Sequence, residues 1–227
     1  MKKVIVISGG SDGLGKTIAK RLSYKNTVII LSPTKQKLEK AAKEIGCEFE
    51  VCDVSEYSQV EKAIEAIIKK HKRIDCVINN AGLWIQGELD ENNPDDIKKV
   101  IEVNTTGVIF LSKAIIPQMK KQKNGLIINI DSYAGLVAKA ERTVYNASKW
   151  AITGFSKSLQ PELAKYNIGV TCIYPGMMVT EMFEKMGIHK DMKKGVETDE
   201  VAKTIEFILS FDNPVLFPDI GIKHIEN

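Results

Sequence analysis

Two residues with complementary chemistry, Tyr145 and Lys149, stand four positions apart in the segment VYNASK. On an α-helix, residues i and i+4 share one face, so the phenol and the ammonium would point into the same space. A tyrosine hydroxyl titrates near pH ~10 in water, and a nearby cation favours its anion by Coulomb attraction. The spacing fits a general acid–base group with an electrostatic partner. A surface pair, with the tyrosine half buried and the lysine solvated, fits it as well.

A second chemical feature is the glycine-rich segment SGGSDGLG, residues 8–15, which stands between an apolar run and an amphipathic stretch. Glycines in a strand-to-helix turn let the backbone bend tightly and approach a ligand closely. The following helix N-terminus offers free N–H groups and a partial positive charge to a pyrophosphate. The segment therefore predicts a phosphate cradle, and the alternative is a plain glycine turn.

Short runs rich in valine and isoleucine alternate with helix-length segments along the chain. The expected strands are residues 3–8, 27–31, 47–51, 75–79, 125–130, 169–174 and 214–217. The expected helices are residues 14–24, 35–45, 55–70, about 93–122, 143–165 and 198–209. This alternation predicts one doubly wound α/β domain over residues 1–227, with a seven-stranded parallel sheet and helices on both faces. Ligands of such sheets lie outside the carboxyl ends of the strands.

Composition narrows the class of protein. The 227 residues carry a formal net charge of +3 with the basic residues spread along the chain, which gives no indication of a nucleic-acid partner. No run approaches the ~20 apolar residues that span a bilayer. Four cysteines without Cys-x-x-Cys spacing and three separated histidines indicate neither a disulfide framework nor a metal site. We expect a cytoplasmic protein with no membrane role.

Four motifs occur together and in a fixed order. They are Gly9-x-x-x-Gly13-x-Gly15, the segment NNAG at residues 79–82, Ser132 thirteen residues before Tyr145, and Tyr145-x-x-x-Lys149. In this combination the chain resembles the short-chain dehydrogenase/reductase family, in its single-domain branch, over nearly its whole length. The resemblance implies a Rossmann-like fold. It also implies an oxidoreductase that transfers a hydride between NAD(P) and a carbonyl or secondary alcohol.

The resemblance assigns roles to four residues. Tyr145 is expected to be the general acid–base group, and Lys149 to tune it and to hold the nicotinamide ribose. Ser132 would donate a hydrogen bond to the substrate oxygen, where charge develops. Asn104 would connect Lys149 to solvent through its backbone and a bound water. The plain alternatives are a turn serine at position 132 and a helix-interior amide at position 104.

The resemblance also distributes the cofactor contacts along the chain. Asp53 and Val54 would lie beside the adenine, although DVSE is equally a good helix-capping sequence. The turn, the ribose segment and the nicotinamide segment supply the other expected contacts, which are Gly9, Ser11, Asp12, Gly13, Leu14, Gly15, Asn80, Ala81, Gly82, Pro175, Gly176 and Thr180.

Two signals bear on the 2′-phosphate of the cofactor and disagree. An acidic residue at the end of the second strand would bind the ribose hydroxyls of NAD and repel the phosphate of NADP. Ser32 stands there instead, and Thr34 and Lys35 follow as possible phosphate ligands. Asp12, just before Gly13, argues the other way, because users of NADP often carry a basic residue there. We expect NADP(H) to be preferred over NAD(H).

The sequence says least about the substrate. The substrate lid is expected at about residues 181–197, a methionine-containing segment that could equally be plain packing. Trp84 and Arg142 are candidates to border the substrate, and Arg142 could meet an anionic or polar group. The ending at 213–227 lacks the Asp-Gly-Gly of many tetrameric relatives, and we expect a homodimer or homotetramer through helices 93–122 and 143–165. The competing function is a cofactor-binding regulator without turnover.

Overall fold

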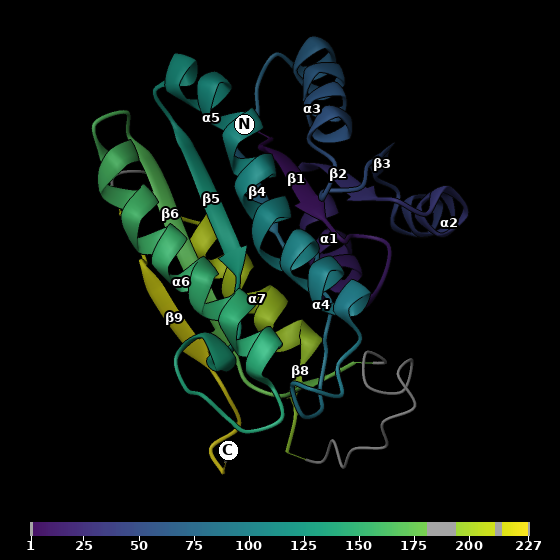
Figure 1. The fold of residues 1–227 in the computed structure, drawn as a ribbon. Helices are drawn as coiled ribbons and strands as arrows, with labels where there is room; N and C mark the ends of the chain where they lie inside the picture. Colours follow the sequence, from purple (N-terminus) through teal and green to yellow (C-terminus); the bar gives the residue numbers. More distant parts are fainter. Residues whose placement is uncertain (1, 181–193, 212–214, 227) are drawn as a thin grey trace.

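The computed structural model describes residues 2–180, 194–211 and 215–226. Its main sheet has seven parallel strands in the order β3-β2-β1-β4-β5-β6-β9 (Figure 1). These strands are β1 (Val4–Ser8), β2 (Thr27–Ser32), β3 (Glu48–Val51), β4 (Cys76–Asn79), β5 (Gly125–Ile130), β6 (Ile168–Pro175) and β9 (Asp219–Ile222). The order reverses between β1 and β4, so a crevice opens there at the carboxyl ends of the strands. The predicted doubly wound parallel sheet is confirmed.

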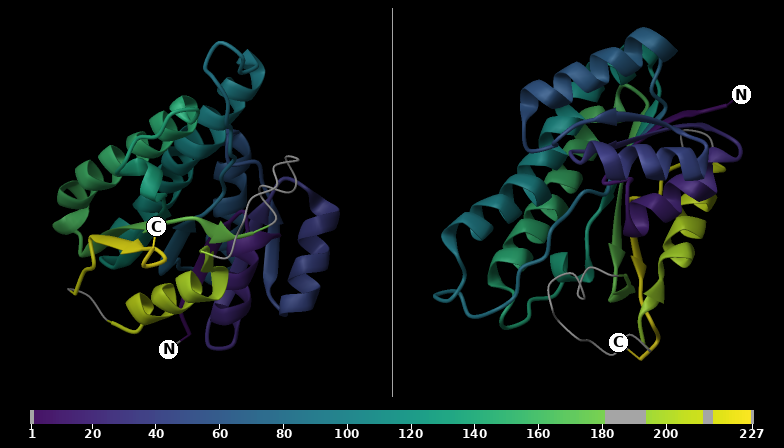
Figure 2. Two further views of the ribbon diagram at one scale, coloured as in Figure 1. Left: turned by 90° about the horizontal axis from the view of Figure 1, so that it is seen from below. Right: turned by 90° about the vertical axis from the view of Figure 1, so that its right-hand side faces the viewer.

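Helices cover both faces of the sheet, as the edge-on view in Figure 2 shows. The helices are α1 (Gly13–Ser23), α2 (Lys35–Ile45), α3 (Tyr57–His71), α4 (Pro94–Ile101), α5 (Gly107–Gln122), α6 (Thr143–Ala164) and α7 (Thr198–Leu209). The apolar sides of α1, α2 and α7 pack on one face, and those of α3, α5 and α6 pack on the other. The central strands are buried throughout, which explains why they read as continuous apolar runs.

The predicted helix at about 93–122 is interrupted in its middle. A π-helical turn, Glu102–Thr106, separates α4 from α5. Such turns widen the backbone spiral and are frequent at functional sites. By length and composition alone, Pro94–Gln122 could cross a membrane. In the fold, however, Leu111, Ile115 and Met119 of its α5 part belong to the core beneath the sheet, so this is a packed helix of the domain.

One predicted strand is wrong. The apolar run at 214–217 does not supply the seventh strand, because residues 215–217 are not in a strand and β9 begins at Asp219. Phe217 instead packs against the core. Pro218 lacks a backbone N–H, but its carbonyl accepts a hydrogen bond from Cys172 N at 2.9 Å. β9 is an edge strand whose residues are only partly buried, so its segment DIGI gave no continuous apolar signal.

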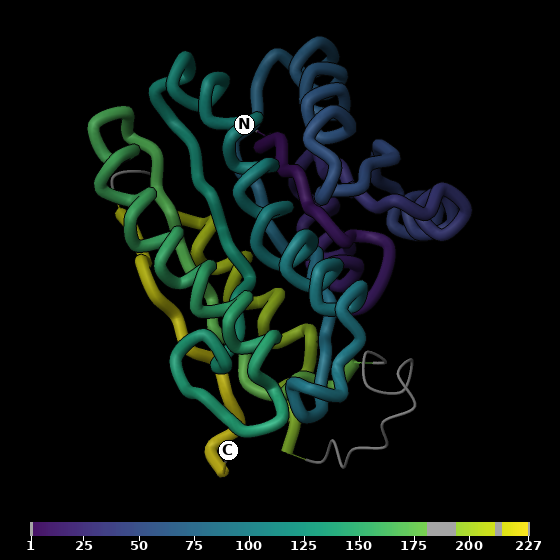
Figure 3. The backbone as a smooth tube through the Cα atoms, viewed as in Figure 1, coloured from purple at the N-terminus to yellow at the C-terminus, as the bar shows by residue number. Residues whose placement is uncertain are grey.

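Two short elements were not predicted from the sequence. Strands β7 (Met178–Val179) and β8 (Val196–Glu197) pair in parallel and form a small second sheet. They bring the segment after β6 next to the start of α7, as the tube in Figure 3 lets the reader follow. The predicted lid at about 181–197 falls mostly on residues 181–193, which lie outside the described residues.

Candidate active site

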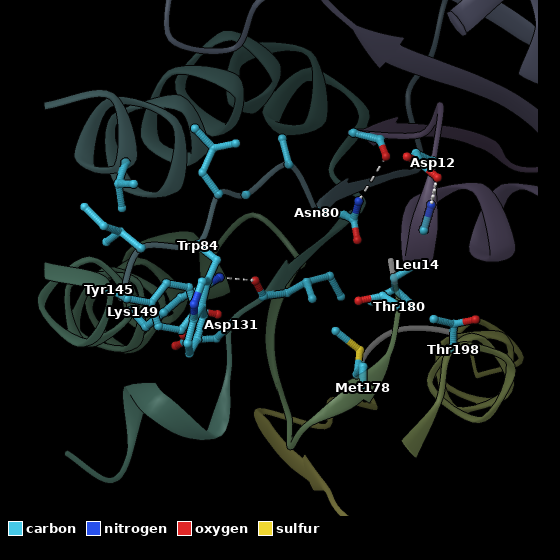
Figure 4. A pocket seen from close by; sticks show the side chains of 18 of the residues that line it. Asp12, Leu14, Asn80, Trp84, Asp131, Tyr145, Lys149, Met178, Thr180 and Thr198 are labelled. Atoms are coloured by element: carbon cyan, nitrogen blue, oxygen red, sulfur yellow. Dashed lines mark hydrogen bonds between the residues drawn. The ribbon is translucent and has the colours of Figure 1, made fainter. Parts of the chain in front are cut away.

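A cavity of about 840 Å³ opens at the carboxyl ends of the central strands. Figure 4 shows its two ends. Trp84, Asp131, Tyr145 and Lys149 gather at one end, and Asp12, Leu14 and Thr198 lie at the other. We call this the first cavity. It joins the turn that follows β1 to the first turns of α6, so the two motifs of the sequence face one space.

The turn between β1 and α1 is built for close backbone approach. Gly9 and Gly13 have φ values of +65° and +49°, a region that glycine adopts without steric cost. A Cβ on Gly15 would overlap the carbonyl oxygen of Gly9 and would lie 2.5 Å from Asn80 Nδ2. Asp12 caps α1 by accepting a hydrogen bond from Gly13 N at 2.8 Å. The glycines of the turn therefore present backbone to the first cavity, beside the side chains of Asp12 and Leu14.

Hydrogen bonds from the end of β4 fix this turn. Ser8 Oγ accepts hydrogen bonds from Asn80 N at 3.0 Å and from Ala81 N at 3.1 Å. Asn80 Nδ2 donates to the carbonyl oxygens of Ser8 and Gly9 at 3.0 and 3.3 Å. The expected glycine turn and the expected ribose segment are thus tied together at the switch point of the sheet, and the first cavity lies along both.

Tyr145 and Lys149 lie on one face of α6, as their spacing predicts. Tyr145 is 9% exposed and Lys149 is 6% exposed. The Lys149 ammonium donates a hydrogen bond to the carbonyl oxygen of Ile130 at 3.0 Å and lies 5.9 Å from the centre of the Tyr145 ring. A buried lysine with this anchor is held at a fixed place between the end of β5 and the phenol. The surface-pair reading of the motif does not fit this burial.

Ser132 lies beside the tyrosine but in an adjoining space. Both residues line a second cavity of about 710 Å³, which shares Trp84, Asp131, Tyr145, Met178 and Thr180 with the first. The Ser132 hydroxyl caps the short 3₁₀ helix Tyr133–Gly135 by accepting a hydrogen bond from Ala134 N at 3.1 Å. Its hydroxyl hydrogen is left to donate elsewhere, so the turn-serine and catalytic readings are compatible.

Asn104 lies in the π-helical turn, lines neither cavity and is 1% exposed. Its side-chain oxygen accepts a hydrogen bond from Leu83 N at 2.7 Å, and its Nδ2 donates to Leu83 O at 2.8 Å and to Ser148 Oγ at 3.1 Å. The amide thus clamps the segment after NNAG onto α6, one residue before Lys149. The side chain is thus occupied in fixing these two segments, and the part expected of the Asn104 backbone stays a prediction.

Sequence reasoning missed Asp131, which lines both cavities. It is 4% exposed, and its Oδ2 accepts a hydrogen bond from Thr153 Oγ1 at 2.8 Å, whereas its Oδ1 is buried without a hydrogen-bond partner in the described part of the chain. Burial raises the pKa of this carboxyl from 3.8 to about 6, and the positive charge of Lys149 works against that rise. Its place directly after the buried run of β5, next to Ser132, was the available signal.

Trp84 covers the ring of Tyr145. The two ring centres are 4.3 Å apart with an angle of 53° between the planes, within the range of favourable aromatic pairs. The Arg142 guanidinium lies 5.0 Å from the centre of the Trp84 ring, a cation–π distance. Trp84 and Arg142 both line the second cavity, so each borders the space in which a substrate would meet Tyr145.

The other expected cofactor residues divide between the cavities and their surroundings. Those that line the first cavity are Gly9, Asp12, Gly13, Leu14, Asn80, Ala81, Gly82 and Thr180, while Pro175 and Gly176 line the second. Lys16, Thr17 and Thr198 also line the first cavity and were not expected. Ser11, Gly15, Ser32, Thr34, Lys35, Asp53 and Val54 line neither.

Several of the residues expected near the adenine and the 2′-phosphate bond to neighbouring residues. The Ser11 hydroxyl donates to Ser32 Oγ at 3.1 Å. Thr34 begins α2 without a side-chain capping bond, so its hydroxyl is not used there. Asp53 Oδ1 accepts hydrogen bonds from the backbone N and the hydroxyl of Ser55 at 3.0 and 2.6 Å, which fits the capping reading of DVSE.

A dinucleotide fits these residues on structural grounds. A Cβ on Gly9 or Gly15 would overlap Ala81, Asn80 or the Gly9 carbonyl, so the turn packs closely on the end of β4. Gly13 lines the first cavity and has open space where a Cβ would stand, so a pyrophosphate could approach its backbone closely. The first cavity continues from this turn past Asn80 to Tyr145 and Lys149, and the half of a dinucleotide that runs from its pyrophosphate to its nicotinamide matches this path.

Comparisons with known proteins agree with this geometry. The family model described as short chain dehydrogenase matches residues 3–191. Carbonyl reductase family member 4 from Xenopus tropicalis is 33% identical over 207 residues, which cover 90% of this chain and 84% of that protein.

Solved structures show the same architecture with either nicotinamide cofactor. An alcohol dehydrogenase from the archaeon Thermococcus sibiricus, complexed with 5-hydroxy-NADP, has a TM-score of 0.91 at 26% identity, covering 100% of this chain and 98% of its own. An NAD⁺-bound xylitol dehydrogenase has a TM-score of 0.88 at 25% identity, with 98% of each chain covered.

Proposed function

The chain belongs to the short-chain dehydrogenase/reductase family of oxidoreductases, and we propose that it is an enzyme that transfers a hydride between NAD(P) and a carbonyl or secondary alcohol. The observation that carries this proposal is the buried pair Tyr145 and Lys149 at one end of a cavity whose other end is a glycine cradle. An acid–base group and a nucleotide site facing one space are the two requirements of this reaction.

The cofactor would be held by the turn after β1, by the Asn80–Gly82 segment and by Lys149. When bound, its nicotinamide supplies a hydride to the substrate carbon or accepts one from it. Tyr145 gives a proton to the substrate oxygen during reduction and takes one during oxidation. Lys149, anchored on Ile130 O, favours the phenolate by Coulomb attraction. Ser132, in the same cavity as Tyr145, donates a hydrogen bond to that oxygen as charge develops on it.

The neighbours of Tyr145 exclude water from the reacting atoms. Trp84 covers the phenol ring, and Val144 and Ile85 belong to the same small apolar cluster. Asn104 holds this wall to α6 through Leu83 and Ser148. A partly desolvated site strengthens the electrostatic interaction between Lys149 and Tyr145, and this supports a reaction in which the phenol changes charge.

NADP(H) is the proposed cofactor. At the end of β2 and the start of α2, Ser32 and Thr34 carry hydroxyls and Lys35 carries an ammonium. The first turn of α2 contains no acidic residue. Nothing there repels a 2′-phosphate, and a helix N-terminus favours one. Lys35 is exposed and approaches Glu39 at 3.7 Å, a weak surface pair that a phosphate can replace.

Replacing the phenol hydroxyl separates an enzyme from a cofactor-binding regulator. Tyr145→Phe keeps the ring and its packing on Trp84 but removes the proton donor, so kcat should fall by about 10³-fold, which lies within the ordinary range of general acid–base effects. The dissociation constant for NADPH should stay within a few-fold. Steady-state reduction of simple ketones, followed at the nicotinamide absorbance, measures the first quantity, and a fluorescence titration measures the second.

Tyr57→Phe is the matched control, because Tyr57 lies on α3 and packs against Phe110, away from both cavities. It should change neither quantity. Equal turnover by the wild type and Tyr145→Phe would refute the proposed role. A wild type that binds NADPH but reduces no carbonyl compound would favour the regulator.

A further inference from the structure

The second cavity carries an unequal set of charges. Among the described residues, its charged lining consists of one acid, Asp131, and four bases, Lys139, Arg142, Lys194 and Lys223. The described lining of the first cavity is balanced, with Asp12, Asp96 and Asp131 against Lys16, Lys99 and Lys149. The excess of positive charge is therefore confined to the space on the substrate side of Trp84 and Tyr145.

Most of this positive charge is not neutralised within the described part of the chain. Lys194 forms an ion pair with Glu226 at 2.8 Å. Arg142, Lys139 and Lys223 make no ion pair with a described carboxylate; Arg142 and Lys223 instead face the rings of Trp84 and Tyr133 at 5.0 Å. Clustered like charges raise the potential of a cavity and attract an opposite charge into it.

Asp131 does not cancel this field at the cavity mouth. It is 4% exposed and bound to Thr153, and the positive charge of Lys149 acts on it. Its charge is therefore buried and partly offset by Lys149. A ligand entering past Lys139 and Lys223, both exposed, meets the bases first.

Arg142 is the base best placed to orient a bound group. It is the residue immediately before α6 and stands three positions before Tyr145, so both residues lie at the N-terminal end of this helix. Its cation–π contact with Trp84 holds the guanidinium beside the ring, and a guanidinium binds a carboxylate through two parallel hydrogen bonds. The positive end of the α6 dipole adds to the field at this point.

A buried polar group next to the tyrosine also lacks a partner. Asn146 lines the second cavity and is 7% exposed, and its side-chain oxygen has no hydrogen-bond partner among the described residues. Burying an unpaired amide oxygen is costly, so a ligand that donates a hydrogen bond there is favoured. An alcohol or a protonated group beside the reacting carbon would satisfy it.

We propose that the substrate is an anionic carbonyl or alcohol, an oxo acid or hydroxy acid whose carboxylate is held by Arg142 with the support of Lys139 and Lys223. This inference rests on the proposed function, because it places the carboxylate relative to the carbon that Tyr145 serves. The acid is reduced with its carboxylate unchanged. The carbonyl becomes a secondary alcohol by addition of one hydride from the nicotinamide and one proton from Tyr145.

The test compares three oxo acids with their own methyl esters, which differ only in the charge: 3-oxobutanoate, 4-oxopentanoate and 5-oxohexanoate. Binding to the protein saturated with NADP⁺ or NAD⁺ is followed by the fluorescence of Trp84 in a Trp150→Phe background, since the chain has two tryptophans. This readout needs no turnover. At least one acid should bind about tenfold more tightly than its ester. High salt should lower the affinity for the acid and leave the affinity for the ester unchanged.

Variants assign the effect to its residues. Arg142→Gln should lower the affinity for the acid about tenfold and leave the affinity for the ester within twofold. Lys194→Gln is the matched control, because Lys194 lines the same cavity but is paired with Glu226; it should leave the preference for the acid unchanged. The kcat/KM values for acid and ester, measured with NADPH and NADH, should show the same pattern.

Equal affinity for acid and ester, or a preference that survives Arg142→Gln, would overturn the inference. So would the absence of binding by every acid up to its solubility limit. If the enzyme reduces the esters in any of these cases, the proposed oxidoreductase function is supported, and only the proposal of an anionic substrate fails. A chain that binds neither nicotinamide cofactor would overturn the proposed function as well, and the cofactor titration that precedes each experiment detects this.

Discussion

At the scale of single residues, the site depends on buried groups whose charge the fold controls. Lys149 and Asp131 are both nearly inaccessible to water, and they lie on either side of the end of β5. A buried carboxyl and a buried ammonium each cost free energy unless paired. Lys149 has a carbonyl partner, whereas one Asp131 oxygen has none.

Asp131 should therefore make stability depend on pH. Its pKa is raised from 3.8 to about 6 by burial, so between these values the folded chain holds a proton that the unfolded chain releases. Stability falls as pH rises through this window, by about 3 kcal/mol at ~1.4 kcal/mol per pKa unit. Asp131→Asn cannot ionise. The free energy of unfolding of this variant, measured by urea denaturation, should rise relative to that of the wild type by roughly 3 kcal/mol between pH 4 and pH 7.

The matched control for this comparison is Asp90→Asn, since Asp90 is an exposed carboxylate outside both cavities. Its free energy of unfolding should follow that of the wild type at every pH. If the difference in free energy of unfolding between Asp131→Asn and the wild type is the same at pH 4 and pH 7, folding does not raise the pKa of Asp131.

At the scale of elements, the glycine turn between β1 and α1 has the strictest geometry. Gly15→Ala places a Cβ against the carbonyl oxygen of Gly9 and the amide of Asn80, and neither backbone nor anchored amide can move away. We expect a loss of about 1–3 kcal/mol in stability, as for overpacking in a core. The affinity for NADPH should fall more than tenfold.

The control for the turn is Gly221→Ala in β9, where an added Cβ would meet nothing within 4 Å. It should leave the affinity for NADPH and the unfolding midpoint close to those of the wild type. Unchanged affinity in Gly15→Ala, measured by the same fluorescence titration, would mean that the cofactor does not approach this turn.

The elements also show what the sequence could predict. The buried strands and the amphipathic helices were predicted within one or two residues, because hydrophobic periodicity reports burial directly. The last strand was misplaced because an edge strand needs little apolar surface, and the apolar run before it packs against the core without pairing. The π-helical turn at Asn104 was missed, because hydrogen-bond register inside a helix leaves no trace in hydrophobic spacing.

For the site, motif spacing predicted which residues meet but not how they are partnered. Tyr145, Lys149 and the glycine turn face one cavity as predicted. Asp131, Thr198 and the covering of Tyr145 by Trp84 depend on contacts between distant segments, which one sequence does not display. The same holds for the charge of the second cavity, whose bases come from the loop before α6, from the residues before β8 and from the chain after β9.

At the scale of the whole molecule, the predicted dimer has a candidate surface. Trp150 on α6 is 52% exposed and Ile109 on α5 is 37% exposed, and both helices cover the same face of the sheet (Figure 1). A half-exposed tryptophan is expensive to leave in water. If α5 and α6 pair with a second copy, Trp150→Glu should weaken the dimer at least about 30-fold, equivalent to about 2 kcal/mol.

Sedimentation equilibrium at micromolar concentration measures this change. Phe207→Glu is the comparison variant, because Phe207 is 54% exposed on α7 on the opposite face and packs with Phe211 and Phe217. It should leave the dimer intact. Dissociation by Phe207→Glu and not by Trp150→Glu would move the interface to α7.

The central claim is that the first cavity binds a nicotinamide dinucleotide for redox chemistry at Tyr145. Titration of the wild type with NADPH and with NADH, followed by nicotinamide fluorescence, tests it without knowledge of the substrate. The account predicts saturable binding of one cofactor per chain, with NADPH bound more tightly than NADH. Tighter binding of NADH would mean that Asp12 outweighs the Ser32–Lys35 turn, and binding of neither cofactor would contradict the account.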